Sequence, residues 1–303
     1  MRGERAATTL FPVTTPTKET GMPRISANGI ELGYDLSGTG ETLVLVHGSW
    51  SDRNNWLPVV SELARTFRVV AYDRRGNGLS TRDVPASRRD HEDDLAALIE
   101  GVSGEPAHVV GTSFGASIAL GLASRRPELL QSVVAHEPPL VSLVAGDPEV
   151  RAEVELVQAS VAAVLAHIGR GETTAAAEQF VEEVALGPGT WKLLPQPLRE
   201  TMIDSAAAFV VEQADPMWAN VDLEALASIS TPILLTEGDE SPAWFAPIVA
   251  TLADAIGHAE VHTYHGAGHA PHQTHPDDYL AVVPEWLSRV SAGRGLPAGA
   301  MAG

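Results

Sequence analysis

The chain has no cysteine, and this absence limits the chemistry open to it. Disulfide bonds, catalysis by a thiolate and metal sites with cysteine ligands are all excluded, because each of them requires a sulfhydryl group. Basic residues are also scarce: 20 lysines and arginines stand against 39 aspartates and glutamates, so the net charge is −19 at pH 7. A surface this acidic repels nucleic-acid phosphates and anionic membranes. We therefore expect neither a nucleic-acid partner nor a membrane partner.

Long apolar runs are the third absence. The segment 1–22 lacks the continuous apolar core of a signal peptide, and we expect no later stretch to be long and apolar enough to span a bilayer. These features predict a cytoplasmic protein. The two ends carry little apolar periodicity, so we predict a disordered leader over 1–22 and a flexible tail over 292–303.

Between these ends, short apolar and β-branched runs alternate with helical patterns. The predicted strands lie in TLVLVHG, RVVAYDRRG, AHVVGTS, QSVVAHEPP, TPILLTEGD and AEVHTYHGAGHA. Strands that are almost continuously apolar and are separated by single helices are typical of a parallel sheet covered on both faces. With 44% hydrophobic residues, the chain can fill such a core. The predicted fold class is therefore α/β, with a mostly parallel central sheet.

The alternation of strands and helices is interrupted over 140–228, where no convincing strand occurs. Apolar residues follow a helical spacing there, at Val150, Val154, Val157, Val161, Val164 and Ile168, and again at Leu198, Met202, Ala206 and Phe209. We interpret this interval as a helical insertion. The core is then predicted to comprise 23–139 and 229–291.

The strand AHVVGTS runs directly into a helical segment, and the junction GTSFG (111–115) is a candidate nucleophile site. A serine on a sharp strand-to-helix turn has its hydroxyl pushed away from the backbone, and Gly111 and Gly115 leave room for that turn. The amino terminus of the helix favours the negative charge that develops in acyl transfer. The bare pattern also occurs in ordinary turns, but its position here indicates Ser113 as the nucleophile.

Five landmarks in one order, HGSW, YDRRGNGLS, GTSFG, TPILLTEGD and GAGHAPHQTHPDDYL, resemble the α/β-hydrolase superfamily over 25–290. The resemblance implies an α/β-hydrolase fold in which the helical insertion is a cap over the site. It also implies an oxyanion hole formed by the backbone N–H groups of Ser49 and Phe114. Asp73 and Arg74 are expected to pin a loop near the site. No cofactor is implied.

The resemblance also identifies the base that a serine nucleophile needs. The catalytic histidine is expected just beyond the last strand, at His269 in GAGHAP. Because further histidines crowd the same stretch, a metal site is the alternative interpretation; they are His262, His265, His272 and His275. Their spacing is not that of a usual zinc signature, and a carboxylate would have to replace the missing cysteines. We therefore predict no metal.

The third member of the triad is a carboxylate that orients the imidazole. In most of the superfamily it lies three residues after the glycine that ends the strand TPILLTEG, but that position here is Ser241. In a minority branch the acid lies at the end of the strand that follows the nucleophile helix. This chain has Glu137 there, in HEPP. Glu137 is the predicted acid, and Asp239 is the alternative.

The resemblance implies a serine hydrolase that cleaves a carboxylic ester or lactone through an acyl-enzyme. Relatives that open epoxides or remove halide carry an aspartate in place of Ser113, which disfavours those reactions. Two alternatives stay open: hydrolysis of a carbon–carbon bond next to a carbonyl, and a receptor that binds its ligand with little turnover. The placement of the acid also resembles bacterial lactonases that open the macrocycle zearalenone.

The expected partner is a small apolar ester or lactone, and a homo-oligomer is left open. Aromatic and sulfur-containing side chains near the cap are predicted to line the pocket, with plain packing between cap and core as the alternative. These predicted lining residues are Trp50, Trp191, Phe209, Met217 and Trp218.

Overall fold

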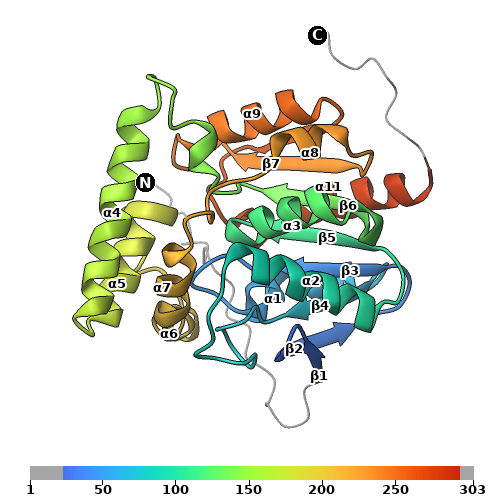
Figure 1. The fold of residues 1–303 in the computed structure, drawn as a ribbon, viewed down its shortest axis with the longest axis horizontal. Coiled ribbons are helices and arrows are strands. Elements are labelled where there is room, and N and C mark those ends of the chain that lie inside the picture. Colours follow the sequence, from blue (N-terminus) through green and yellow to red (C-terminus); the bar gives the residue numbers. More distant parts are fainter. Residues whose placement is uncertain (1–22, 294–303) are drawn as a thin grey trace, which may run out of the picture.

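The computed structural model describes residues 23–293, so the leader predicted over 1–22 and almost all of the tail predicted over 292–303 lie outside the described residues. At its centre is an eight-stranded sheet with the strand order β1-β2-β4-β3-β5-β6-β7-β8 (Figure 1). The strands are β1 (Arg24–Ala27), β2 (Ile30–Ser37), β3 (Thr42–Val46), β4 (Arg68–Tyr72), β5 (Ala107–Thr112), β6 (Leu130–His136), β7 (Ile233–Gly238) and β8 (Glu260–Tyr264).

The sheet is mostly parallel, which confirms the prediction. All strand pairs from β4 to β8 across the sheet are parallel, whereas β2 runs antiparallel to β4 and β1 antiparallel to β2. β3 and β5 are buried at every residue, because helices cover the sheet above and below them. The carboxyl ends of the parallel strands therefore meet at one edge, where a site can form.

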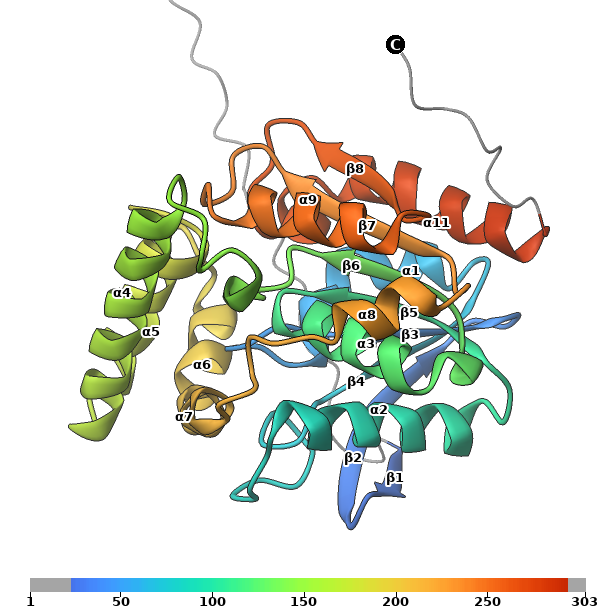
Figure 2. The same cartoon turned by 45° about the horizontal axis from the view of Figure 1, so that its top comes forward.

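Helices cover both faces of the sheet, as predicted (Figure 2). On one face lie α2 (Arg88–Val102), α3 (Phe114–Arg125), α8 (Leu223–Ser228) and α9 (Phe245–Ile256); on the other lie α1 (Leu57–Leu63), α10 (Pro271–Thr274) and α11 (Pro276–Ser291). Short 3₁₀ turns η1 (Arg53–Trp56), η2 (Pro127–Leu129) and η3 (Val141–Leu143) join these elements. The apolar sides of the helices fill two layers: Leu95 and Ile118 pack on one face of the sheet, and Val59 and Val283 on the other.

Residues 140–228 lie between β6 and β7, and we call them the cap segment, although their last helix, α8, packs against α3 and α9 on the sheet. The helices α4 (Arg151–Gly169), α5 (Thr173–Gln179), α6 (Gln196–Asp204) and α7 (Ala206–Ala214), with the π-helix η4 (Phe180–Ala185), gather on one side of the sheet (Figure 1). They share an apolar cluster of their own, which includes Val164, Val181, Trp191 and Phe209. The ring of Trp50, which follows β3, joins this cluster and ties the cap segment to the sheet edge.

α4 differs from what we expected of its sequence. It is the one helix of the described chain that is long and apolar enough to cross a membrane by length and composition, with a mean hydropathy of 1.3 over its window. The expectation that no such stretch exists is therefore wrong, because valines form most of the packed side of this helix and alanines recur on its exposed side. One helix of this kind is weak support for a membrane span, and the cytoplasmic location stays a prediction.

Among residues 23–293, five histidines are buried in this fold: His47, His91, His108, His136 and His272. Burial lowers the pKa of each imidazole below its ordinary value, because a buried cation loses its hydration. These imidazoles are therefore neutral in the folded protein at neutral pH. The stability that these groups contribute is complete above a pH of about 6.5, and it is lost as the pH falls, because the unfolded chain then binds protons that the folded chain does not.

His91 offers the simplest test of this linkage. Its ring lies edge-on to Phe114, with 5.6 Å between the centroids, and neither ring nitrogen has a hydrogen-bond partner within the described chain. We expect His91→Phe to keep the packing and remove the titration. The free energy of unfolding at pH 5 should rise by about 2 kcal/mol more than it does at pH 8, as measured by urea unfolding. Equal changes at the two pH values would show that folded His91 binds a proton.

Candidate active site

Ser113 occupies the junction of β5 and α3, and its backbone is forced into a rare conformation. Its φ of 53° and ψ of −125° lie where L-residues are seldom found. The turn is so tight that it needs both flanking glycines: a Cβ on Gly111 would lie 2.4 Å from the carbonyl oxygen of Gly115, and one on Gly115 would lie 2.2 Å from that of Val46. The Ser113 N–H donates to the carbonyl of His136 at 2.8 Å, which fixes the turn to β6.

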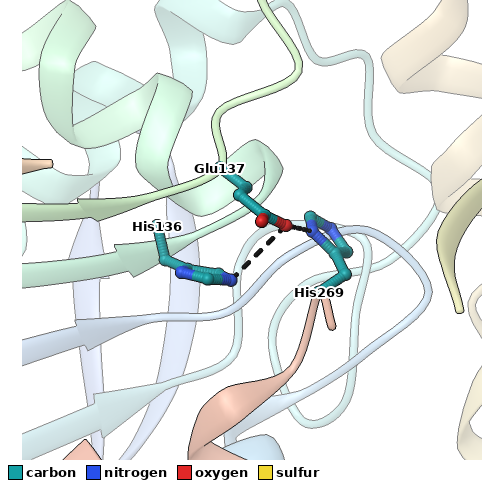
Figure 3. Close-up of side chains that lie close together, drawn as sticks. All are labelled: His136, Glu137 and His269. Carbon is teal, nitrogen blue, oxygen red and sulfur yellow. Dashed lines mark hydrogen bonds and ion pairs between the residues drawn. The ribbon is translucent and has the colours of Figure 1, made fainter. Parts of the chain in front are cut away.

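Glu137 lies one strand away, directly after β6, and its side chain is fully buried. Its Oε2 accepts a hydrogen bond from His269 Nδ1 at 2.5 Å, and its Oε1 accepts one from the Gly238 N–H at 2.7 Å. A second imidazole faces the same carboxylate, with His136 Nε2 3.5 Å from Oε2 (Figure 3). The structure thus brings together Glu137 and His269, which are 132 positions apart in the sequence.

The surroundings of Glu137 decide its charge. Burial on its own would raise the pKa of the carboxyl, but the His136 and His269 imidazoles and the Gly238 N–H outweigh burial and hold that pKa well below its usual range. The carboxylate is therefore ionised at neutral pH and can only accept hydrogen bonds. It follows that His269 carries its proton on Nδ1, which leaves Nε2 free as an acceptor.

His269 and Ser113 border the same cavity, although no hydrogen bond joins their side chains within residues 23–293. Hydrogen bonds between a nucleophile and its base are often long before a substrate is bound. The ring of Phe245 stacks on the imidazole of His269, with 4.5 Å between centroids and 19° between the planes. Phe245 and Glu137 together therefore fix the plane of the His269 ring.

Asp239, the alternative acid, is used elsewhere. Its Oδ2 accepts from His265 Nδ1 at 2.8 Å, and its Oδ1 accepts from the Gly266 N–H at 2.7 Å. Both contacts lie on the exposed loop that follows β8. Asp239 thus holds this loop, and the structure places Glu137 at His269 instead.

The other histidines of the carboxy-terminal stretch do not form a group with metal-ligand spacing among residues 23–293. His262 contacts Tyr264, His265 is exposed beside Asp239, His272 is buried between Trp56 and Tyr279, and His275 bonds Thr274. In the described part of the chain, the group with metal-ligand spacing is instead His136, Glu137 and His269, whose ligand atoms lie within 4.8 Å of one another. The short hydrogen bond between Glu137 and His269 already uses two of these three groups.

The loop after β3 brings Ser49 beside Ser113. A Cβ on Gly48 would lie 3.0 Å from Ser113 Cβ, so the loop approaches the serine as closely as a glycine permits. Neither the Ser49 N–H nor the Phe114 N–H has a hydrogen-bond acceptor within residues 23–293. Asp73 holds a neighbouring loop, because its carboxylate accepts from the N–H groups of Arg53 and Leu79.

A cavity of about 280 Å³ lies between Ser113 and the cap segment, and its wall is mainly apolar. Phe209 and Trp218, two of the predicted lining residues, form part of this wall. A smaller cavity of about 80 Å³ meets Ser113 and His269 as well, and Trp50 lines it. The two cavities therefore lie next to the same serine and histidine.

Two predicted lining residues lie outside the walls of both cavities. Trp191 is buried in the apolar cluster of the cap segment, and Met217 has 55% of its surface exposed. Sequence reasoning missed most of the wall of the larger cavity, which includes Val157, Val161, Leu165, Phe180, Val184, Trp244 and Phe245. The helical spacing of valines in α4 was the available signal for the first two of these.

Comparison with known proteins shows to which family the chain belongs. The model of the alpha/beta hydrolase family matches residues 43–282. The chain therefore belongs to the α/β-hydrolase family, and the predicted fold is confirmed.

The individual relatives are hydrolases, but they do not share one named substrate. The chain is 30% identical to the putative carbamate hydrolase RutD of Pantoea ananatis over 263 residues, which is 82% of this chain and 89% of that protein. It is 36% identical to the uncharacterized hydrolase YraK of Bacillus subtilis over 128 residues, but this match spans 41% of this chain and only 47% of that protein. An α/β hydrolase from Sphaerobacter thermophilus superposes with a TM-score of 0.70 at 26% identity, over 88% of this chain and all of that one.

Proposed function

We propose that this hydrolase cleaves a carboxylic ester or lactone of a small, apolar substrate through an acyl-enzyme on Ser113. The observation that carries the proposal is the buried Glu137–His269 pair at the cavity that Ser113 borders. In this arrangement Ser113 Oγ attacks the carbonyl carbon and His269 Nε2 takes the proton, while Glu137 stabilises the imidazolium that forms. The free N–H groups of Ser49 and Phe114 receive the oxyanion.

His269 then gives this proton to the leaving alcohol, which leaves the acyl group on Ser113. In the second half a water molecule attacks the acyl carbon with His269 again acting as the base, and the proton passes to Ser113 Oγ as the bond to the acyl group breaks and the acid is released. The two unequal cavities favour a substrate with one bulky apolar part and one small part on either side of the carbonyl. A macrolactone such as zearalenone is one candidate of this class.

A carbon–carbon hydrolase is the second candidate. The chain is 38% identical to a 2-hydroxymuconate semialdehyde hydrolase of Pseudomonas sp. over 118 residues, which cover 41% of that protein. The same serine and histidine serve that reaction, because it too passes through attack on a carbonyl. A receptor with little turnover is distinguished from both enzymes by its rate alone.

The experiment that tests the proposal measures proton release in a weakly buffered pH-stat. The panel contains p-nitrophenyl esters, a small lactone, zearalenone and a carbamate, and a vinylogous diketone is followed by its absorbance. A parallel sample is treated with a fluorophosphonate and analysed by peptide mass spectrometry. We expect ester or lactone turnover and a phosphonyl group on Ser113. Turnover of the diketone alone would favour carbon–carbon cleavage, and tight ligand binding without turnover would favour a receptor.

The larger cavity predicts a size limit that a single residue can change. Val161 on α4 lines this cavity, whereas Ala159 on the same helix is exposed and lies outside its wall. We expect Val161→Trp to lower kcat/KM for p-nitrophenyl octanoate by about 10- to 100-fold, because the indole ring would occupy the space of several methylenes of the octanoyl group. The acetate ester should change little. Ala159→Trp is the matched control, and an equal loss there would contradict the assignment of the wall.

A further inference from the structure

One charged side chain of the cap segment reaches the loop that holds Ser49. Glu212, on α7, is buried with 3% of its surface exposed. Its Oε2 accepts a hydrogen bond from the Ser49 hydroxyl at 2.6 Å, and its Oε1 accepts one from Arg74 Nη2 at 2.7 Å. Glu212 is thus held by two donors from the core of the protein, 163 and 138 positions away in the sequence.

Arg74 extends this contact to the backbone of the loop. Its Nε donates to the carbonyl of His47 at 3.0 Å, and its Nη2 donates to the carbonyl of Gly48 at 2.9 Å. The Arg74 N–H also donates to His47 Nε2 at 3.0 Å. Two carbonyls and one hydroxyl of the consecutive residues 47–49 are therefore bound by a single buried ion pair, one half of which belongs to the cap segment.

We propose that Glu212 is a positioning residue for the oxyanion hole, so that the hole is complete only while α7 lies against the loop. The inference rests on the proposed function, in which the Ser49 N–H receives the oxyanion. The Ser49 hydroxyl and N–H belong to one residue, so a short charge-assisted bond to the hydroxyl also restrains the direction of the N–H. A displacement of about 1 Å at such a donor costs about 100-fold in rate.

The contacts of Glu212 fit a positioning role and not a part in proton transfer. Both carboxylate oxygens are occupied by Ser49 and Arg74, and no hydrogen bond within the described chain joins Glu212 to Ser113 or His269. An unpaired carboxylate beside the hole would oppose a developing oxyanion, but the guanidinium of Arg74 balances it. Glu212 therefore positions the loop and takes no part in proton transfer.

The test compares Ser49→Ala, Glu212→Gln and the double variant with p-nitrophenyl butyrate as substrate and butylboronic acid as the probe of the tetrahedral state. We expect kcat to fall about 10-fold in Ser49→Ala and about 10- to 100-fold in Glu212→Gln, with KM within about 2-fold. Boronate affinity should fall in parallel with kcat, whereas affinity for the product butyrate should not. The double variant should be no worse than Glu212→Gln alone, because both changes remove one interaction.

Controls separate positioning from stability. Glu212→Gln leaves Arg74 without its buried partner and lowers stability, whereas Ser49→Ala keeps that ion pair and so carries the test even if Glu212→Gln folds poorly. Glu200→Gln, on the exposed side of α6, is the matched control and should leave kcat unchanged. If the wild type is active and Ser49→Ala has the same kcat, the positioning role of Glu212 is overturned but the proposed function is not. A wild type that neither hydrolyses the ester nor takes up a fluorophosphonate overturns the proposed function, and the inference with it.

Discussion

Glu137→Gln is expected to lower kcat by about 10⁴-fold, while Asp239→Asn leaves kcat within about 2-fold of the wild type. Glutamine fills the same space as glutamate, but its neutral amide does not stabilise an imidazolium. Its NH₂ group also competes with His269 Nδ1–H as a donor, which favours the wrong tautomer of the ring. Steady-state kinetics on the best ester or lactone of the panel measure both variants. A large loss in Asp239→Asn would contradict the assignment of the acid.

Stability against pH gives an independent reading of the same substitution. The pKa of Glu137 is depressed in the folded protein, so its stabilising contribution is present above its ordinary pKa of about 4.3 and is lost as the pH falls through the folded value. Glu137→Gln should therefore lower the free energy of unfolding at pH 7, lower it by less near pH 3, and change it least near pH 2, where the folded carboxyl is itself protonated. An equal loss at all three pH values would indicate a packing defect in the variant.

Ser113→Ala is expected to have the largest effect, with kcat reduced by about 10⁶-fold and no phosphonyl adduct. The side chain is the nucleophile in the proposed reaction, and Ser113 borders both cavities together with His269. A small residual rate should persist, because the oxyanion hole and the cavity still bind the substrate. Retained turnover with unchanged rates would contradict acyl transfer through this residue.

Ser113→Gly provides the control for folding. The positive φ of Ser113 strains any residue with a Cβ, and glycine adopts that conformation without strain. We expect Ser113→Gly to be as inactive as Ser113→Ala but more stable than it, by about 1 kcal/mol in urea unfolding. The pair separates loss of chemistry from loss of structure, because only stability should differ between the two variants.

The sequence predicted the inner strands β3 to β7 because they are largely buried and therefore form nearly continuous apolar runs. The β1–β2 hairpin was missed for the opposite reason. It forms the edge of the sheet, and several of its side chains are exposed. Its turn did carry a signal: Asn28 and Gly29 both have positive φ, at 48° and 78°, and this dipeptide is typical of tight hairpins.

The candidate site divides in the same way. Ser113 was predicted from its motif, and Glu137 and His269 from the family resemblance; the structure places all three near one another because strand ends of a parallel sheet meet at one edge. The residues of the cavity wall could not be predicted, because the side chains that face the cavity depend on how each cap helix is rotated about its axis. Trp191 and Met217 were chosen for their chemistry, yet the structure turns one into the packing of the cap segment and the other to solvent. Glu212 was missed because a glutamate in an amphipathic helix usually faces water.

β7 lies between the strand that carries the acid and the strand that leads to His269, and the loop after it should tolerate substitutions in this chain. β7 contributes only a backbone group to the Glu137–His269 pair: the Gly238 N–H, which donates a hydrogen bond to Glu137. A backbone donor tolerates changes in neighbouring side chains, so we expect 239–242 to accept substitutions that would inactivate relatives with their acid there. Gly238 itself is fixed, since a Cβ would lie 2.3 Å from the carbonyl oxygen of Ala267. Moving the acid by one strand thus leaves the β7–α9 loop, which leads to Trp244 and Phe245 at the cavity, open to evolve with the substrate.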